Sequence, residues 1–393
     1  MTSVSDQQMK SKLIMILERQ GYVVSGNTFS LPDSDRETKR QVHILSKAER
    51  VNEHYKFILS NADLIGKYII DGKDLDINKI QPKLILVQTN TLWETLFRWW
   101  NLTWWSLPYE RAYGRQLRFI VWDEYHKAPI GLIGLQSPLL SWGVRDKHLD
   151  LQPERRDYWI NQSLNAQRLG ALPPYNNILG GKLVALLMAS NVVCEEYEKK
   201  YKRTKTILEK RRIPSRLLFI TTTGAYGKSS IYNRLKYNDE YVAKFIGYST
   251  GSGSFHIPNI FFEELLHFLE SKDVNIRRGY GSGPSRKMRL IDTALNYLGF
   301  KNGVNHGIKR AVYFFPLVTN LQEIITQNAS PVWYNRSVND LTDYWKIHWA
   351  AKRIEKDKTY LSFNGKRYLK SELKNIDKSN KEFREFNKWI SSK

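Results

Sequence analysis

Apolar residues recur at helical spacing through the first part of the chain. In residues 9–20, aliphatic side chains fall on one face of a helix, and residues 38–61 continue in the same style after polar connectors. Six aromatic side chains then lie within the fourteen residues 92–105. So dense a group is more typical of a core or a domain seam than of exposed platforms for stacking bases. The pattern predicts a helical N-terminal domain, residues 1–112.

Beyond residue 112 the pattern changes to short apolar runs separated by turns. The first two runs flank a polar turn that ends at Pro129, which predicts a β-hairpin. The expected strands are residues 117–122, 130–135, 168–172, 216–221 and 244–249. The expected helices are one with Leu179, Leu183, Leu186 and Leu187 on its apolar face, one at 229–237 and one at 261–271. The alternation predicts a mixed α/β core, residues 113–320.

Residues 321–393 carry helical patterns among interspersed charges and predict a helical, basic C-terminal region. The expected fold class is therefore α+β. Strand, glycine-rich helix start, strand, helix, strand is also the order in the acetyl-coenzyme-A-binding core of GNAT-type acetyltransferases, and the core resembles that fold. Residues 177–183 match its pyrophosphate loop loosely, without the usual leading Arg or Gln and with only two adjacent glycines. We therefore predict no bound cofactor.

The composition of the chain predicts a binding partner. The chain has 393 residues, with 61 Lys+Arg against 39 Asp+Glu, for a formal charge of +22. Such an excess attracts polyanions, so DNA is the first partner to expect, although a basic surface also serves solubility alone. Residues 199–212 and 346–393 are locally basic. Each of these stretches is equally consistent with a solvated helix face or a linker.

The composition also argues against several classes of protein. There is no run of about 18 uncharged apolar residues to span a membrane, and residues 1–12 hold no secretory signal. A single cysteine, Cys194, cannot form an internal disulfide and fits a reducing compartment. We therefore expect a cytoplasmic protein that does not bind the membrane. None of the eight histidines lies within four residues of another, so the sequence predicts no local metal site.

Basic residues beside glycine-rich turns are candidates for phosphate contact, because backbone N–H groups and the dipole at a helix start favour anions. Gly227-Lys228-Ser229 resembles the end of a Walker A loop, but Thr222 stands where that loop needs glycine, which argues against a nucleoside triphosphatase. The turn at 281–284 suits either a clamp on a DNA backbone or a purely structural role. The candidates are Lys182, Lys228, Arg234, Lys236, Arg277, Arg278, Arg286, Lys287, Arg289, Lys309 and Arg310.

Polar side chains beside the same turns form a candidate central site. Its members are Tyr175, Asn176, Ser229 and Ser230. Capping of turns is an equally good explanation for such residues. Whether the protein is an enzyme stays open, and the candidates for catalysis are Tyr232, Asn233, Asp146 and His306. In a nuclease, Tyr232 would attack DNA or an assembled carboxylate cluster would activate water, with Mg²⁺ neutralising charge.

Several stretches together resemble one family. They are 113–115, 119–123, 130–135, 145–146, Leu-Gly-Ala-Leu-Pro-Pro-Tyr-Asn at 169–176, Leu-Gly-Gly-Lys-Leu-Val-Ala at 179–185, 227–235, 251–253, 281–284, 306–310, Tyr313 and 316–317. Their order and spacing resemble the Druantia anti-phage DruA family from about residue 88 to residue 349. The resemblance implies a bacterial defence component, encoded with other Druantia proteins including a large helicase, that acts against phage nucleic acid. Relatives often carry an acid where this chain has Asn165, which puts a carboxylate mechanism in doubt.

The charge, the turns and the resemblance together favour a DNA-binding anti-phage protein that senses or loads phage DNA for partner proteins. Three other hypotheses stay open. One is a metal-dependent nuclease or nicking enzyme, one is an acyltransferase, and one is a scaffold for the defence complex. The sequence does not fix the oligomeric state, and self-association is one option.

Overall fold

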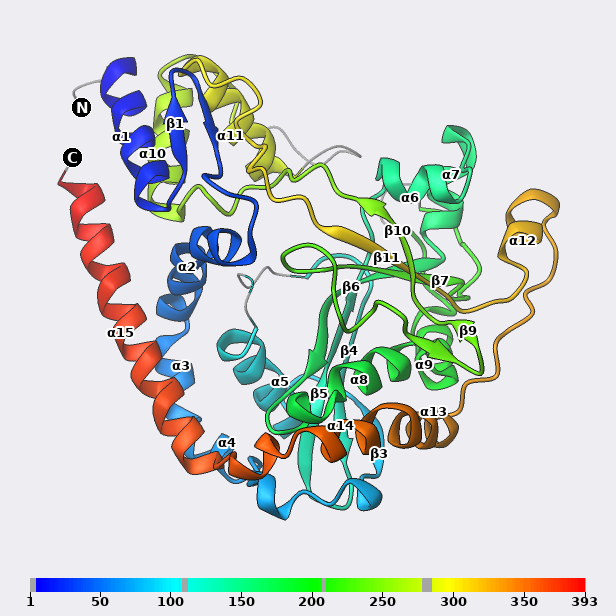
Figure 1. Cartoon of the computed structure of the whole chain (residues 1–393). Coiled ribbons are helices and arrows are strands. Elements are labelled where there is room, and N and C mark those ends of the chain that lie inside the picture. Colours follow the sequence, from blue (N-terminus) through cyan, green and yellow to red (C-terminus); the bar gives the residue numbers. More distant parts are fainter. Residues whose placement is uncertain (1–4, 106, 108–111, 207–209, 278–284, 393) are drawn as a thin grey trace.

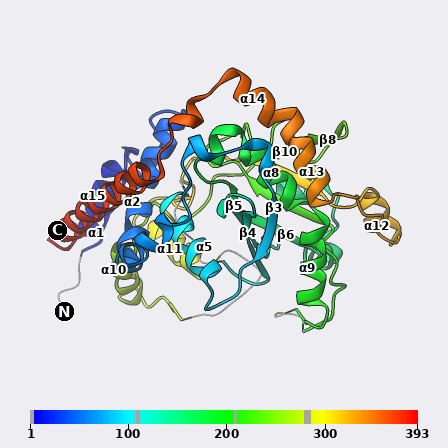
Figure 2. The same ribbon diagram turned by 90° about the horizontal axis from the view of Figure 1, so that it is seen from below.

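The computed structural model describes residues 5–105, 107, 112–206, 210–277 and 285–392. A seven-stranded sheet lies at its centre, and a group of helices lies to one side of it (Figures 1 and 2). The strands are β1 (Val23–Ser25), β2 (Thr28–Ser30), β3 (Pro82–Leu86), β4 (Gln116–Asp123), β5 (Ala128–Gln136), β6 (Ser163–Ala171), β7 (Phe219–Thr223), β8 (Lys236–Tyr237), β9 (Glu240–Tyr241), β10 (Lys244–Tyr248) and β11 (Ala311–Pro316).

The helices lie before, between and after these strands along the chain. They are α1 (Asp6–Arg19), α2 (Arg36–Glu53), α3 (Tyr55–Ser60), α4 (Ala62–Gly66), α5 (Leu92–Thr103), α6 (Gly143–His148), α7 (Pro153–Ile160), α8 (Gly180–Met188), α9 (Asn191–Tyr201), α10 (Asn259–Glu270), α11 (Arg286–Tyr297), α12 (Leu321–Gln327), α13 (Val338–Trp345), α14 (Ala351–Lys356) and α15 (Gly365–Ser391). Short helical turns are η1 (Gly72–Asp74), η2 (Ile77–Lys79), η3 (Tyr175–Ile178), η4 (Lys346–Ala350), which is a π-helix, and η5 (Thr359–Ser362).

The strand order of the central sheet is β10-β11-β7-β6-β5-β4-β3, with antiparallel neighbours except for the parallel pair β6 and β7. The predicted hairpin is confirmed as β4 and β5. All nine residues of β5 are buried, because α8 packs on one face of the sheet and α5 on the other. Strands β3 and β11 were not predicted. Short apolar runs such as the six buried residues of β11 do not distinguish a strand from a buried helix.

The helix predicted at residues 229–237 is wrong, because this stretch forms turns and the first strand of a short hairpin. Its apolar residues have helical spacing, but Arg234 has a φ of 57°, which a right-handed helix excludes. Asn238 and Asp239 join β8 to β9 with φ values of 47° and 63°. Two such residues in succession make the type I′ turn that Asn and Asp favour. The Asn-Asp pair was therefore a local signal for this hairpin.

Helix α5 carries the aromatic cluster, and its central tryptophans are buried. Trp99 and Trp100 are 0% and 1% exposed, and Trp99 Nε1 donates a hydrogen bond to Ile58 O at 3.0 Å. The same apolar cluster includes Ile120 and Leu132 of the sheet. These tryptophans therefore form a seam between the N-terminal helices and the sheet, as predicted, because water and bases do not reach their faces.

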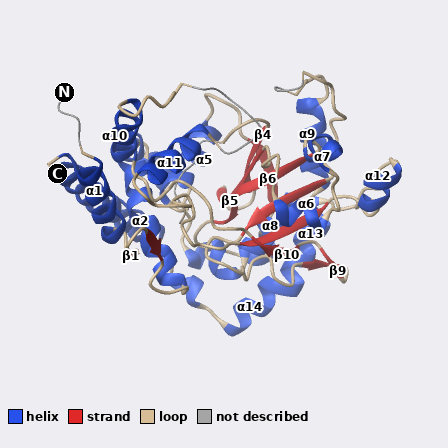
Figure 3. Ribbon diagram, turned by 90° about the horizontal axis from the view of Figure 1, so that it is seen from above, coloured by secondary structure: helices blue, strands red, loops and turns tan. Residues whose placement is uncertain are grey.

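One hydrophobic core lies between the central sheet and α8, and a second hydrophobic core joins segments that are far apart in the sequence. Leu13 of α1, Phe261 of α10, Ile291 of α11 and Phe386 of α15 all belong to it. We call these four helices, together with α2 and the β1–β2 hairpin, the helical lobe, and Figure 3 shows it to one side of the strands. The 27-residue helix α15 packs along α2, so both chain ends lie on this lobe (Figure 1). Each of the three predicted domain ranges thus contributes to one core.

Candidate nucleic-acid interface

A cavity of about 430 Å³ lies at the edge of the sheet where β10 is the last strand. The loop between β7 and β8 lines it, together with β9, β10 and one residue of β11. The lining residues are Lys228, Tyr232, Asn233, Arg234, Tyr241, Ala243, Lys244, Phe245 and Tyr313. The fold therefore brings two predicted phosphate contacts and two predicted catalytic candidates into one place.

Two side chains from other elements hold the β7–β8 loop in position. Lys182 Nζ of α8 donates hydrogen bonds to Ile231 O at 3.1 Å and to Asn233 O at 3.2 Å. The Tyr313 hydroxyl accepts a hydrogen bond from the Ser229 N–H at 2.8 Å and donates one to Asn233 Oδ1 at 2.9 Å. The backbone and one side chain of the loop are therefore anchored to α8 and to the sheet.

Arg234 follows this anchored segment and has a left-handed backbone. Its φ of 57° costs a residue with a side chain about 1 kcal/mol or more. Its neighbour Leu235 is fully buried in the hydrophobic core between the sheet and α8, and Tyr232, two residues before Arg234, is buried in the same core. Such strain persists only where the surroundings hold the backbone. The burial on both sides therefore holds the exposed Arg234 at the cavity.

Three cations line the cavity and no acid does. Lys228, Arg234 and Lys244 take part in none of the ion pairs between described residues. Lys236 of β8 lies beside them, with its Nζ 4.8 Å from the centre of the Tyr241 ring. Uncompensated cations around a concave surface focus the electrostatic potential there. The cavity is therefore suited to an anionic ligand.

Exposed aromatic rings accompany these cations. Tyr241, Phe245 and Tyr248 are 49%, 42% and 48% exposed. The rings of Phe245 and Tyr248 pack edge to face with centres 5.2 Å apart, and Lys228 Nζ lies 5.2 Å from the centre of the Phe245 ring. Both rings belong to β10, where a bulge interrupts the pairing with β11. The sequence predicted this strand but not its place at the sheet edge, so Lys244 and these rings were missed.

Lys182, predicted as a phosphate contact, is instead 9% exposed and turned toward the protein. Burial lowers the pKa of its ammonium group to about 8. Besides the two loop carbonyls, its Nζ contacts the face of Trp349, 5.4 Å from the ring centre. The side chain therefore holds the β7–β8 loop, and it does so from behind the cavity.

Replacing Lys182 by methionine is expected to release this loop while the core stays folded, because methionine fills a similar volume and donates no hydrogen bond. Trypsin should then cleave after Arg234 about tenfold faster, since local opening exposes the backbone. Lys200→Met is the matched control, because Lys200 Nζ donates one hydrogen bond, at 2.8 Å, to Gln116 O of β4. Equal rates of cleavage after Arg234 in the two variants would contradict the role of Lys182 in holding the β7–β8 loop.

The glycine-rich start of α8 serves packing in this fold. Gly180 and Gly181 are buried, and a Cβ added to Gly180 would lie 2.6 Å from Tyr175 O. Trp345 of α13 covers this helix start and donates a hydrogen bond from Nε1 to Leu179 O at 3.1 Å. The two glycines therefore allow close contact between protein segments, where the sequence pattern had suggested close approach of a phosphate.

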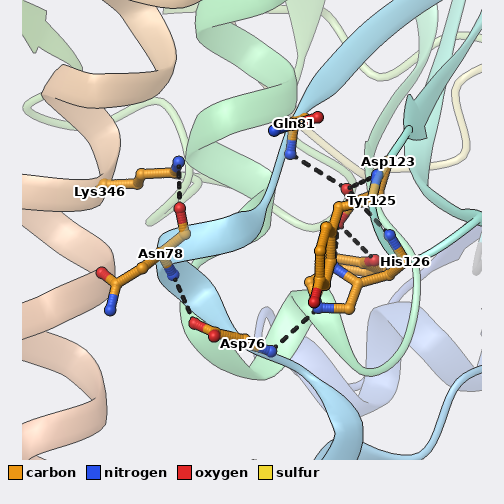
Figure 4. Close-up of polar contacts among 8 residues, drawn as sticks. Asp76, Asn78, Gln81, Asp123, Tyr125, His126 and Lys346 are labelled. Carbon is orange, nitrogen blue, oxygen red and sulfur yellow. Dashed lines mark hydrogen bonds and ion pairs between the residues drawn. The ribbon is translucent and has the colours of Figure 1, made fainter.

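A buried carboxylate organises the turn between β4 and β5 (Figure 4). Asp123 is 0% exposed, and its Oδ1 accepts hydrogen bonds from the N–H groups of Gln81 and Tyr125, both at 3.1 Å. Its Oδ2 accepts from the Tyr175 hydroxyl at 2.9 Å and from His126 Nδ1 at 2.6 Å. Burial, with the nearby carboxylate, raises the pKa of Tyr175. Tyr175 of the predicted central site is therefore a protonated donor inside the core.

The partners of His126 show which of its nitrogens carries the proton. Its Nε2 accepts a hydrogen bond from the Asp76 N–H at 3.0 Å, so the proton lies on Nδ1, which donates to Asp123 (Figure 4). The His126 side chain is only 5% exposed. An Asp-His-Tyr set of this kind suggests catalysis, but here its side-chain hydrogen bonds join its members to one another and to backbone N–H groups. We therefore assign it a structural role.

The other polar candidates occupy different parts of the fold. Asn176 is exposed in η3, and Ser229 and Ser230 lie on the β7–β8 loop. Asp146 Oδ1 accepts hydrogen bonds from Arg145 Nε at 2.8 Å and Nη2 at 2.6 Å, and its Oδ2 accepts one from the Trp142 N–H at the start of α6 at 2.8 Å. Among them, Ser229 has a turn role, because its Oγ accepts a hydrogen bond from the Ile231 N–H at 3.2 Å.

The catalytic candidates do not all meet at the cavity. Tyr232 and Asn233 line it, whereas Asp146 and His306 are not among the lining residues. The Tyr232 hydroxyl donates to a backbone oxygen of β6 at 3.4 Å, and burial raises its pKa. A protonated phenol that faces the sheet is poorly placed to attack a phosphate in the cavity.

Three buried histidines pack around Phe255 between the helical lobe and the sheet. His43, His256 and His306 are 1%, 0% and 5% exposed. Burial lowers the pKa of His43 to about 3, of His256 to about 4 and of His306 to about 2. The charge of Arg310, a predicted phosphate contact whose Nη2 lies 3.1 Å from His43 Nε2, acts in the same direction on His43 and His306. All three histidines are therefore neutral near pH 7.

The remaining predicted phosphate contacts lie around α11 and before β11. Arg286 Nε donates to a backbone oxygen at 2.8 Å, and Lys287 Nζ donates to Asn259 Oδ1 at 2.6 Å. Arg286 and Lys287 are therefore not cavity residues, and their hydrogen-bond partners do not line the cavity either. Arg277 and Lys309 are exposed, Arg289 is partly buried, and Arg278 and the turn at 281–284 lie outside the described residues.

Three further features bear on the class of protein. Among the helices that the structure describes, none combines the length and apolar character needed to cross a bilayer. The same residues contain no group of three His, Cys, Asp or Glu placed to hold one metal ion. Burial raises the pKa of the free thiol of Cys194 to about 12.

Comparison with known proteins shows the family. The family described as Druantia protein DruA matches residues 33–327. The chain is 36% identical over 327 residues to the Druantia protein DruA of Escherichia coli (strain UMEA 4076-1), which covers 82% of this chain and 81% of that protein. No solved structure matches, so the resemblance to the GNAT fold stays a prediction. The chain belongs to the Druantia DruA family.

Proposed function

We propose that the chain is the DNA-binding component of a Druantia anti-phage system, where it senses or loads phage DNA for partner proteins that include a large helicase. Family membership supports the place in that system. The observation that carries DNA binding is the cavity itself, in which Lys228, Arg234 and Lys244 form no ion pair with any residue that the structure describes. The formal charge of +22 supplies the long-range attraction that brings a polyanion to it.

The arrangement of the side chains favours binding over catalysis. A nuclease needs a nucleophile or a base directed at phosphorus, but Tyr232 donates to the sheet and Asp146 is paired with Arg145. A scaffold has no need of unpaired cations beside exposed rings. Since surface cations without an acidic neighbour raise the affinity for phosphates, the grouping of Lys228, Arg234 and Lys244 at one cavity is best explained by a nucleic-acid ligand.

Neutralising the cavity is expected to weaken DNA binding in a salt-dependent way. The combined variant Lys228→Gln, Arg234→Gln and Lys244→Gln removes about three phosphate contacts, so the slope of log K against log salt should fall by about 2 to 3. Fluorescence anisotropy across a salt series with labelled single-stranded and duplex DNA measures this slope.

A matched control separates these cations from net charge. Lys56→Gln, Lys67→Gln and Lys73→Gln remove the same charge from exposed positions on α3, next to α4 and in η1, outside the cavity. For this control, the slope of log K against log salt should stay within about 1 of the slope for the unmodified protein. The reason is that the control reduces only the general attraction of the protein surface for DNA. Identical losses in the two triple variants would assign DNA binding to the whole surface, and no binding by the unmodified protein would end the proposal.

A further inference from the structure

We propose that the cavity takes a single-stranded segment, with one unpaired base stacked on Phe245 and its flanking phosphates on Lys228, Arg234 and Lys244. This inference rests on the proposed DNA binding and deepens it, because it names the form of the ligand. The cavity volume of about 430 Å³ falls in the range of about 300 to 1,000 Å³ typical of pockets for small ligands. An unpaired nucleotide fits such a space, whereas the bases of a duplex stay stacked inside the helix.

The aromatic rings supply a surface for the base. Phe245 and Tyr248 are 42% and 48% exposed on β10, the outermost strand of the sheet. Tyr248 packs its ring against Phe245 at an interplanar angle of 70°, which supports the Phe245 ring from one side. Aromatic side chains beside a basic groove are the arrangement that binds single strands without sequence preference, since every base has a π-face.

Lys228 contacts the Phe245 ring in the free protein and a phosphate when a base binds. Lys228 Nζ lies 5.2 Å from the centre of that ring, where it makes a cation–π contact. The contact is weak because the side chain is exposed. A stacked base therefore replaces the ammonium group on the ring, and the released lysine reaches a neighbouring phosphate.

The Asn233 amide contributes donors of fixed orientation. The Tyr313 hydroxyl accepts from the Ser229 N–H, so its own hydrogen points to Asn233 Oδ1. That assignment makes Nδ2, with its two N–H donors, the amide atom of Asn233 that Tyr313 does not use, on a residue that lines the cavity. Two amide donors beside a stacking ring suit the carbonyl oxygens on the edge of a base.

The test uses probes of equal charge that differ in their bases. Labelled oligo(dT) of about 15 nucleotides, an abasic deoxyribose-phosphate chain of the same length and a blunt duplex are titrated with the full chain. We expect oligo(dT) to bind at least about tenfold tighter than the abasic chain. Phe245→Leu should reduce oligo(dT) affinity about tenfold, leave abasic binding unchanged and leave the salt slope unchanged, because it removes a ring and no charge.

Tyr125→Leu is the matched control. Tyr125 is 49% exposed on the β4–β5 turn, and Lys79 Nζ lies 5.2 Å from its ring centre, so its setting copies that of Phe245 and Lys228. This variant should bind all three probes like the unmodified protein. A urea midpoint for Phe245→Leu equal to that of the unmodified protein assigns its loss to the ring and not to unfolding.

Two results would overturn the inference, and they differ in what they leave standing. Equal binding of oligo(dT) and the abasic chain, or unchanged oligo(dT) binding by Phe245→Leu, removes base stacking but keeps the proposed DNA binding. No binding of any of the three probes removes the proposed function and this inference together.

Discussion

Replacing Asp123 by alanine is expected to lower the free energy of unfolding by about 4 to 5 kcal/mol. The buried carboxylate accepts hydrogen bonds from two backbone N–H groups, from His126 Nδ1 and from the buried Tyr175 hydroxyl. Alanine leaves these donors without a partner, and each buried unsatisfied donor costs about 1 to 3 kcal/mol. Such a loss is a large part of the roughly 5 to 15 kcal/mol that stabilises a typical domain. Urea unfolding followed by tryptophan fluorescence measures it.

Two companion variants make this prediction sharper. Glu124→Ala removes the neighbouring carboxylate, which lies on the surface near Lys83 and Lys127, and should leave the urea midpoint nearly unchanged. Asp123→Asn keeps one acceptor oxygen and should fall between the alanine variant and the unmodified protein. A midpoint for Asp123→Ala that equals that of Glu124→Ala would show that water replaces the carboxylate at no cost.

Acid is expected to destabilise the protein through His43, His256 and His306. Each folded pKa lies below the ordinary value of 6.5, at about 3, 4 and 2 respectively. Below pH 6.5 the unfolded chain therefore binds more protons than the folded chain, so stability falls as the pH falls and is fully present above that value. From pH 7 to pH 5.5 the three groups together should remove roughly 4 kcal/mol of unfolding free energy.

Comparison with a variant isolates this effect, because burial raises the pKa values of Glu49 and Glu372 and these groups act in the opposite direction. His306→Asn keeps an oxygen able to accept the Ile308 N–H and should remove about a third of the histidine contribution. His267→Asn, at a side chain that is 79% exposed, is the control and should follow the unmodified protein. The same pH dependence of the urea midpoint in all three proteins would contradict this assignment.

Local patterns predicted much of the fold. The β4–β5 hairpin and the amphipathic helices α1 and α10 follow from periodicity and turn residues within each segment, and the burial of the aromatic residues on α5 follows from their density. The prediction at residues 229–237 is wrong for a local reason, because the turn-forming pair Asn238-Asp239 overrides the helical spacing of the apolar residues. Strand β11 was missed for another reason, because an all-apolar run carries no period.

The candidate site was predictable in part. The sequence singled out Lys228, Arg234 and Asn233 from their place beside glycine-rich turns, and the structure places them together at one cavity. It gave no reason to add Lys244 or Phe245, because only the sheet order makes β10 an edge strand beside the β7–β8 loop. Pairing of β10 and β7 on either side of β11 joins segments with no local relation in the sequence.

The sequence by itself determined the net charge, the family and the positions of most periodic elements, because these depend on composition and on short stretches of chain. Only the tertiary structure decided which cations face the solvent. Lys182 and Lys228 have the same side chain, yet one is buried under the loop with a lowered pKa and the other is exposed at the cavity. Desolvation depends on neighbours brought from distant segments, so the burial that separates the two lysines exists only in the folded chain.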